Sequence, residues 1–343
     1  MKRALLLVVL SYVAVTSVMA QERVKAVSKQ RALGAFDYDW HGSVSSDGRF
    51  LTFVDWDTGD LALRDLKTGA NRHLTKKGSW FESDEFALFS TMSPDSKQVA
   101  YTWFDKGGPS LRLVGLDGSG QRVLHHDEAI ASYEPRDWTP DGKWVLATLI
   151  GKDGTNQIVL VSVANGSIRV LQNLVDLRSP LRMKFSPDGR YIAYDFPPRK
   201  DSTDWQIFVL SADGRHKAPL VEHPAKNLLI GWTPDGKRIL IASDRMGTVD
   251  AWLVQVAEGK PQGLPELVKR DLGSWFFPLG FTREGSFYYG VMTEMDELYF
   301  ATLNPVTGKL QSPPTLVSHV GGWSSADWSP DGQQLAYVLR RVL

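Results

Sequence analysis

The sequence predicts an all-β fold built from repeated antiparallel strands, and two observations carry this prediction. A short turn-and-strand signature returns seven times at a nearly constant spacing of 46–49 residues. No window sustains the period of about 3.6 residues that marks an amphipathic helix. Repeats of this length are typical of propeller blades. We therefore predict a β-propeller of four-stranded antiparallel blades, with hairpins that start at Ser45, Ser93, Thr139, Ser186, Thr233, Thr282 and Ser329.

The first two strands of each repeat are joined by a turn of the form S/T-P-D-G. Proline presets φ at the second turn position, aspartate suits the third, and glycine tolerates the left-handed conformation that returns the chain to a strand. An alternating strand such as 191–194 follows. Three copies depart, with Ser46 for proline, Ser96 for glycine, and Arg283-Glu284 for proline-aspartate, so we expect looser turns there. The apolar residues before the turns should fill the core between blades, and they are Met92, Trp138, Phe185, Trp232, Phe281 and Trp328.

Two outer strands complete each repeat. We expect third strands over 60–66, 110–116, 157–163, 206–210, 251–256 and 297–303, and shorter fourth strands over 72–75, 122–124 and 169–171. Seven hairpins predict seven blades. Only six residues follow Tyr337, which is too few for two outer strands. The last blade is therefore either incomplete or closed by the N-terminal segment Val24–Leu33.

Residues 1–20 have the pattern of a signal peptide. Lys2 and Arg3 precede an apolar run over 4–15, and small side chains lead up to Ala20. We expect cleavage before Gln21, export to the periplasm or the outside, and one propeller domain over 21–343; an uncleaved N-terminal anchor is the alternative. No later segment approaches membrane-spanning length.

Composition excludes several classes of function. The 39 basic residues balance 39 acidic ones, and the pI is about 7.1, so no broad positive field favours nucleic acid or anionic lipid. Cysteine is absent, which removes disulfides and thiolate metal sites. With 43% hydrophobic and 23% charged residues the chain is globular, and we expect a monomer held by packing.

No motif for catalysis stands out. The string 322–326, GWSSA, superficially matches the nucleophile elbow G-x-S-x-G but runs into a strand where a helix is needed. No nucleotide-binding motif occurs. We expect no cofactor and no catalytic residue. None of the seven histidines shows a metal-binding spacing, and the weak metal candidates, in equivalent connections between blades, are His126, His223 and His319.

Candidate binding residues fall into two groups. Connections between blades share one propeller face, here called the loop face, and the hairpin turns lie on the other. Exposed aromatic rings beside charges suit a protein interface, although packing beneath their own loops is the alternative. The loop-face candidates are Trp80, Phe81, Glu82, Arg199, Lys200, Trp275 and Phe276. Asp137, Lys184 and Asp327 replace small residues at one repeat position, and we expect them to line the central channel.

The repeated S/T-P-D-G-x-x-[ILV]-x-[YF] hairpins resemble the WD-like repeats of TolB-type propellers over roughly 45–338. The resemblance implies an exported, non-enzymatic scaffold that binds a protein or peptide in the cell envelope. The same repeat also accompanies peptidase and regulatory modules, which leaves two alternatives. One is an enzyme of lyase or hydrolase type, or a small-ligand binder, with its site at the channel mouth. The other is an accessory propeller separated from a catalytic or regulatory domain.

Overall fold

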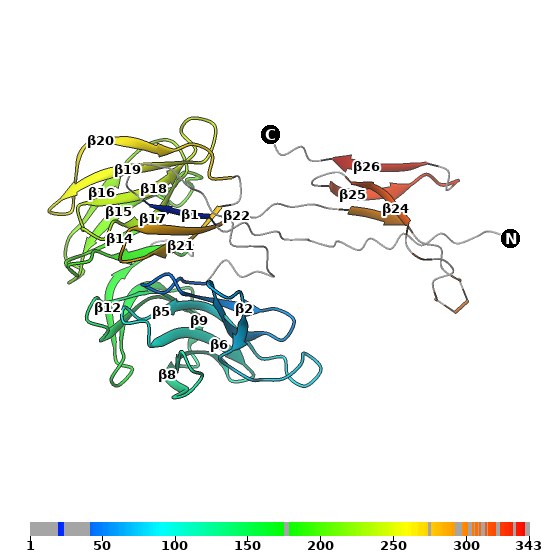
Figure 1. The fold of residues 1–343 in the computed structure, drawn as a ribbon, viewed down its shortest axis with the longest axis horizontal. Coiled ribbons are helices and arrows are strands. Elements are labelled where there is room, and N and C mark those ends of the chain that lie inside the picture. The colour runs from blue at the N-terminus through cyan, green and yellow to red at the C-terminus, as the bar shows by residue number, and fades with distance from the viewer. Residues whose placement is uncertain are drawn as a thin grey trace. The chain divides into compact units, whose positions relative to one another are not determined.

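The computed structural model describes residues 20–23, 42–174, 178–273, 276–291, 297–300, 304, 306, 307, 309, 313, 315–319, 323–331 and 334–339. Their regular elements are strands, β1 to β26 (Figure 1), which confirms the all-β fold class. The strands fall into two compact units, one of β1 to β22 and one of β23 to β26. Across the described ranges, no helix has the length and apolar character needed to cross a membrane. Residues 1–19 of the predicted signal peptide 1–20 lie outside the described residues, and the signal peptide and a single domain over 21–343 stay predictions.

Six antiparallel blades make up the larger unit, and four of them have four strands. Blade 1 comprises β2 (Phe50–Asp55), β3 (Asp60–Asp65) and β4 (Asn71–His73). Blade 2 comprises β5 (Phe86–Met92), β6 (Gln98–Asp105), β7 (Gly108–Gly115) and β8 (Arg122–His126). Blade 3 comprises β9 (Ile130–Trp138), β10 (Trp144–Gly151), β11 (Asn156–Ser162) and β12 (Ile168–Asn173). Blade 4 comprises β13 (Met183–Phe185), β14 (Tyr191–Phe196), β15 (Gln206–Ser211) and β16 (Lys217–Val221). Blade 5 comprises β17 (Asn227–Trp232), β18 (Arg238–Ser243), β19 (Asp250–Ala257) and β20 (Lys260–Lys269).

The sixth blade takes its third strand from the N-terminus. Its inner hairpin is β21 (Phe276–Phe281) and β22 (Ser286–Val291), and β1 (Ala20–Arg23) pairs antiparallel with β22. In the smaller unit, β23 (Glu297–Phe300) pairs with β24 (Thr315–His319), and β25 (Trp323–Trp328) pairs with β26 (Leu335–Leu339). The last two strands are the hairpin of the seventh repeat.

Within the larger unit, the first and the sixth blade are in contact. The Val44 amide donates to the Leu279 carbonyl at 3.0 Å, and the Arg283 amide donates to the Ser46 carbonyl at 2.8 Å, so blade 6 contacts blade 1. The predicted count of seven blades is therefore not confirmed. Residues 24–33, expected to complete the last blade, lie outside the described residues. The N-terminal strand that is described joins the sixth repeat instead.

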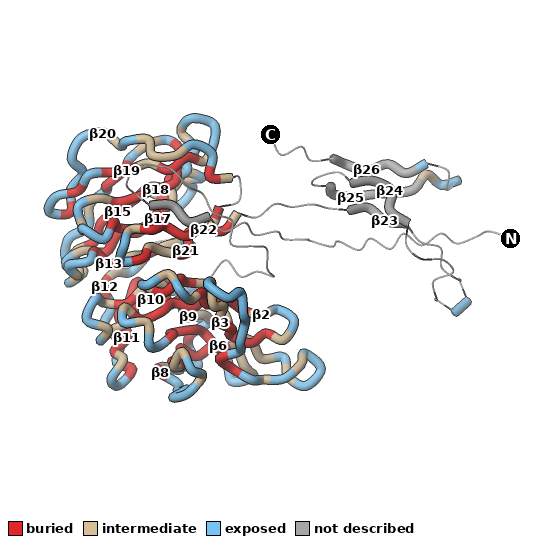
Figure 2. The backbone as a smooth tube through the Cα atoms, viewed as in Figure 1, coloured by how far each residue is buried: buried red, intermediate tan, exposed pale blue. Residues whose placement is uncertain are grey.

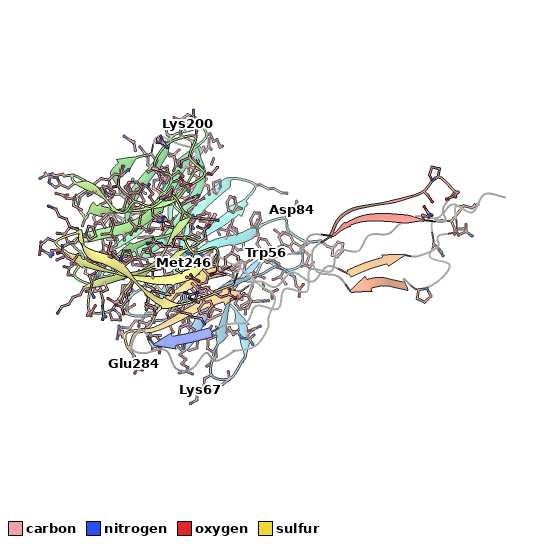
Figure 3. The ribbon with its side chains drawn as sticks, turned by 90° about the horizontal axis from the view of Figure 1, so that it is seen from above. Trp56, Lys67, Asp84, Lys200, Met246 and Glu284 are labelled. Carbon is pink, nitrogen blue, oxygen red and sulfur yellow. The ribbon has the colours of Figure 1, made fainter. Side chains whose placement is uncertain are left out.

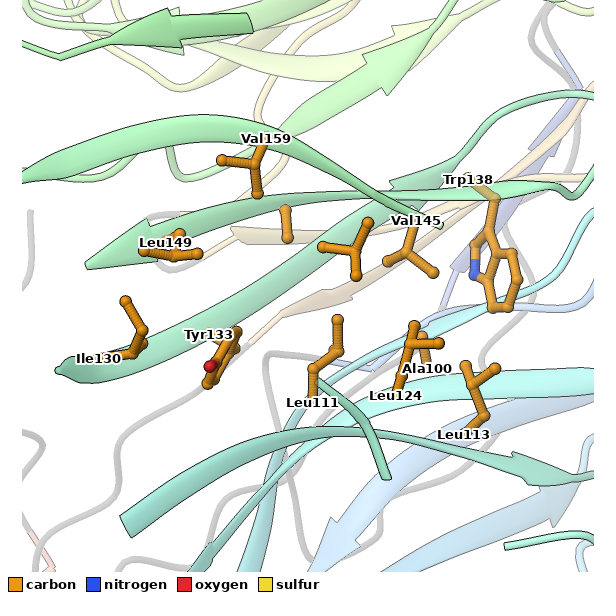
Figure 4. Close-up of a cluster of buried hydrophobic side chains, with 12 residues drawn as sticks. Ala100, Leu111, Leu113, Leu124, Ile130, Tyr133, Trp138, Val145, Leu149 and Val159 are labelled. Carbon is orange, nitrogen blue, oxygen red and sulfur yellow. The ribbon is translucent and has the colours of Figure 1, made fainter. Parts of the chain in front are cut away.

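Apolar clusters between neighbouring blades form the core, as expected from the alternating strands. Figure 4 shows one of them, which joins blades 2 and 3 and contains Trp138. Trp138 and Trp232 keep only 3% and 6% of their surface exposed, so the prediction that they fill the core is confirmed. Their indole nitrogens also donate to the inner strand of the preceding blade, at Thr91 O and Lys184 O, both at 3.1 Å. Burial is concentrated in the strands and exposure in the turns (Figure 2).

Each repeated turn is closed by a side-chain network that explains its sequence. In the third copy, the Thr139 hydroxyl and the Lys143 amide donate to one oxygen of Asp141 at 2.7 and 3.1 Å. These hydrogen bonds hold the pKa of Asp141 below its usual value. Of the looser turns expected in the divergent copies, the one at Ser96 is not found. Ser96 adopts φ +56° in the glycine position, and its amide still reaches the Ser93 carbonyl at 2.8 Å.

Candidate functional site

The inner strands of all six blades meet at a channel mouth on the turn face. A cavity of about 320 Å³ lies there, lined by inner-strand residues and by turn prolines such as Pro94 and Pro140. One repeat position contributes to this wall in every blade, occupied in chain order by Ser43, Thr91, Asp137, Lys184, Gly231 and Gly280. The structure thus places predicted channel residues Asp137 and Lys184 in the wall. Asp327 belongs to β25 of the smaller unit, and its side chain lies outside the described residues.

Asp137 and Lys184 form an ion pair between blades 3 and 4. The Lys184 ammonium lies 3.2 Å from one Asp137 oxygen and also donates to the Arg136 carbonyl at 3.0 Å. The other Asp137 oxygen accepts the Phe185 amide at 2.8 Å. Both side chains are mostly buried, with 20% and 26% exposed. The pair therefore ties two inner strands together as well as lining the mouth.

A second ionic group is buried between blades 4 and 5 and was not expected from the sequence. Asp195 of β14 is fully buried and accepts the amides of Arg182 and Leu229 at 2.9 and 3.0 Å. Burial raises the pKa of Asp195 to about 6 despite these hydrogen bonds. Because Leu229 lies on β17, the inner strand of blade 5, this carboxyl group connects blades 4 and 5. Its sequence context, an aspartate inside an apolar strand, is the one signal that could have singled it out.

Exposed aromatic rings gather on the loop face of blades 1 and 2. The aromatic patch, as we name it, consists of Trp56, Trp80, Phe81, Phe86 and Phe104. Phe86 lies at its centre, stacked on Phe104 with ring centres 4.9 Å apart and 6.0 and 6.3 Å from Trp56 and Trp80. Trp56 and Trp80 are 42% and 37% exposed, and Phe81 is wholly exposed. Sequence reasoning missed Trp56, although a tryptophan within a strand-connecting turn is itself a signal.

The chain segment that carries Phe81 is held in place by local bonds. The Ser79 amide donates to the Glu82 carboxylate at 2.7 Å, and the amides of Glu82 and Ser83 donate to the Ser79 carbonyl. The Trp80 indole donates to the Trp56 carbonyl at 2.9 Å. Phe81 therefore projects into solvent from an ordered turn.

An acidic groove borders the aromatic patch. The groove, of about 420 Å³, is lined by Phe81, Glu82, Ser83, Asp84, Glu85, Phe86, Phe104, Asp105 and Lys106. Four acidic residues and one basic residue therefore line the groove, and besides Glu82 two of the carboxylates are bonded within the chain, Glu85 by the Trp103 indole at 3.2 Å and Asp105 by Arg112 at 2.8 Å. Figure 3 labels Trp56 of the patch and Asp84 of the groove. Both features come from the β2–β3 turn, the β4–β5 connection and the β6–β7 turn, which share one face as predicted for a propeller.

The remaining loop-face candidates differ in their exposure to solvent. Arg199 and Lys200 are exposed. Their backbone carbonyls accept hydrogen bonds from the Arg178 guanidinium, which hold this loop in place. Phe276 is instead a core residue, 7% exposed, because it starts β21 with its ring packed against Phe287 and Tyr289. We therefore correct its assignment as a surface residue. Trp275 lies outside the described residues.

The predicted histidines do not form a metal site in the described part of the chain. His126 bonds to the Pro109 carbonyl at 3.1 Å, and the His223 carbonyl accepts the Asn227 amide group at 3.2 Å. His319 ends β24, and its side chain lies outside the described residues. Within those residues, no group of three or more histidine, cysteine, aspartate or glutamate side chains is placed to hold a metal ion.

Solved structures share this architecture, whereas no family model matches the chain. A structure assigned as TolB from Agrobacterium tumefaciens is 17% identical, with a TM-score of 0.57, covering 81% of this chain and 98% of its own. An oligogalacturonate lyase in complex with manganese is 14% identical, with a TM-score of 0.54, covering 98% and 94%. A chain from a study of two prolyl endopeptidases is 17% identical, with a TM-score of 0.52, covering 95% and 47%. At these identities the likeness establishes the fold, and this chain is a β-propeller of the kind found in TolB-type and related proteins.

Proposed function

We propose that this protein is an exported, TolB-like β-propeller that acts as a non-enzymatic interaction scaffold in the cell envelope, periplasmic or secreted and monomeric. Its partner is a protein or peptide that binds the loop face. The leader-like residues 1–20 and the repeat signature support export and the TolB-like assignment. A propeller that had lost a catalytic or regulatory partner domain would use the same surface.

The observation that carries this proposal is the aromatic patch. Soluble proteins seldom expose large rings in a contiguous group without a binding role. Aromatic residues are enriched among the anchors that dominate interface energies. Phe81 is wholly exposed on a bonded turn, so little conformational entropy is lost when it inserts into a partner.

The test is capture of a partner by the mature chain, 21–343, from envelope extract of its host, followed by calorimetry with the purified partner. Phe81→Ala should weaken binding by about 2 kcal/mol, the usual size of an aromatic anchor. Leu264→Ala is the matched control, because Leu264 is 91% exposed on the outer strand β20. Equal binding by both variants would remove the aromatic patch from the interface.

A second candidate is a small-ligand site at the channel mouth, either binding or catalytic. The cavity of about 320 Å³ and the Asp137–Lys184 pair favour it. Lys184→Met should abolish binding of a small carboxylate such as an oligogalacturonate fragment, followed by calorimetry. No heat with the unmodified protein would end this candidate.

A further inference from the structure

The charges around the aromatic patch indicate the charge of the partner segment that binds there. Glu82, Asp84, Glu85 and Asp105 face the groove, and Lys106 is the one basic residue in its lining. Arg112 offsets part of this charge, because its guanidinium bonds to Asp105 at 2.8 Å. Lys77 also interacts with the charge of Glu82, so four carboxylates stand against three cations, Lys77, Lys106 and Arg112. The surroundings of the groove still carry more negative than positive charge, while the whole chain is balanced. A partner segment that enters the groove is therefore repelled if it is acidic and attracted if it is basic.

The same region already places cations of its own chain against aromatic rings. The Lys77 ammonium lies 3.8 Å from the centre of the Trp80 ring and donates to the Ser83 carbonyl at 2.7 Å. The Arg112 guanidinium lies 5.3 Å from the centre of the Trp103 ring. Ring faces flanked by carbonyl and carboxylate oxygens are favourable surroundings for an ammonium or guanidinium group. Two internal examples show that the local geometry accepts such groups.

We propose that the aromatic patch and the acidic groove together take a basic segment of a partner protein, in which lysine or arginine side chains flank an apolar residue. The apolar side chain covers Phe81 and Trp56. The cationic side chain enters the groove beside Phe104 and pairs with Asp84. This inference rests on the proposed interaction function and adds the chemistry of the partner.

A designed peptide tests this chemistry without a known partner. The probe is a fluorescein-labelled peptide in which lysine and leucine alternate, with two matched peptides that carry glutamate for lysine or serine for leucine. Fluorescence anisotropy with the full mature chain measures binding. We expect binding of the lysine–leucine peptide alone, with an affinity that falls as salt is raised.

Protein variants locate the site. Asp84→Lys should lower the affinity for the lysine–leucine peptide at least about tenfold, since reversing one charge at a desolvated contact changes affinity by this order. Asp201→Lys introduces the same change at an exposed position of blade 4 and should leave binding unchanged. Equal binding of the lysine and glutamate peptides, or equal weakening by both variants, would overturn the inference.

The outcome also separates this inference from the proposed function. A purified envelope partner that is lost with Phe81→Ala but binds Asp84→Lys as tightly as the unmodified chain would keep the scaffold function and refute a basic partner. A partner whose binding Phe81→Ala leaves unchanged would refute the proposed surface itself.

Discussion

The buried carboxyl group of Asp195 makes a quantitative prediction about stability and pH. Its folded pKa of about 6 lies above the ordinary value of 3.8. The folded state therefore binds this proton more tightly than the unfolded state, and the group stabilises the fold as pH falls. Between about pH 7.5 and about pH 5 the free energy of unfolding should rise by about 1.4 kcal/mol. The full rise, about 3 kcal/mol, is reached only below the pKa of the unfolded state.

The perturbation is Asp195→Asn, and the assay is urea unfolding of both proteins at these two pH values. The stability difference between the two proteins should change by about 1.4 kcal/mol, because only the unmodified chain gains on acidification. Contributions from the histidines cancel in this difference. Turn carboxylates such as Asp141 have lowered pKa values, so their stabilisation is lost only at lower pH.

A stability difference that is the same at both pH values would refute this reasoning. Asparagine offers one acceptor oxygen, whereas Asp195 accepts amides from Arg182 and Leu229, so the variant can be too unstable to measure. A carbon-13 carboxyl titration of the unmodified protein then gives the pKa directly. An ordinary value near 3.8 in that titration would contradict the argument equally well.

Two further predictions concern packing. Trp138→Phe removes the indole N–H that donates to the Thr91 carbonyl and so one hydrogen bond between blades 2 and 3. Urea unfolding should show a loss of about 1 kcal/mol, and no measurable loss would contradict this role. Gly59→Ala should shift tryptophan fluorescence and weaken binding of the lysine–leucine peptide. Gly59 has φ +83°, and a Cβ added to it would lie 2.9 Å from the Trp80 ring. Gly247→Ala is its control, with φ +89° and open space, and an identical fluorescence shift in it would show backbone strain alone.

The hairpins could be predicted from the sequence because their determinants are local. Proline, aspartate and glycine within four residues set each turn, and the strand after the Ser186 turn, expected over 191–194, is found as β14. The position of Asp137 and Lys184 followed from aligning the repeats, since equivalent positions in a propeller surround one channel. Their bond to each other could not be seen that way, because it depends on the side-chain conformations that bring Lys184 to within 3.2 Å of Asp137.

Ring closure and surface exposure could not be predicted for a different reason. Closure depends on contacts such as Arg283 with Pro94, which are 189 residues apart and follow from the number and tilt of all the blades. Exposure depends on strand register, in which a shift of one residue exchanges the two faces. The sequence predicts Phe276 on the loop face because it falls in a connection between two repeats, whereas it starts β21 with its ring in the core.

The two candidate sites differ in what a partner gains without breaking bonds that already exist within the chain. At the channel mouth, Lys184 has two acceptors, Asp137 accepts an amide, and both buried indoles have carbonyl partners. A ligand there must compete with these bonds. In the acidic groove, Glu82, Glu85 and Asp105 are likewise bonded, to Ser79, Trp103 and Arg112. Asp84 has no hydrogen bond or ion pair within the described residues, and the neighbouring Phe81 is wholly exposed. Binding at the loop face therefore buries apolar surface and adds a charge pair at Asp84 while existing bonds are kept, which is why we assign the partner to that face.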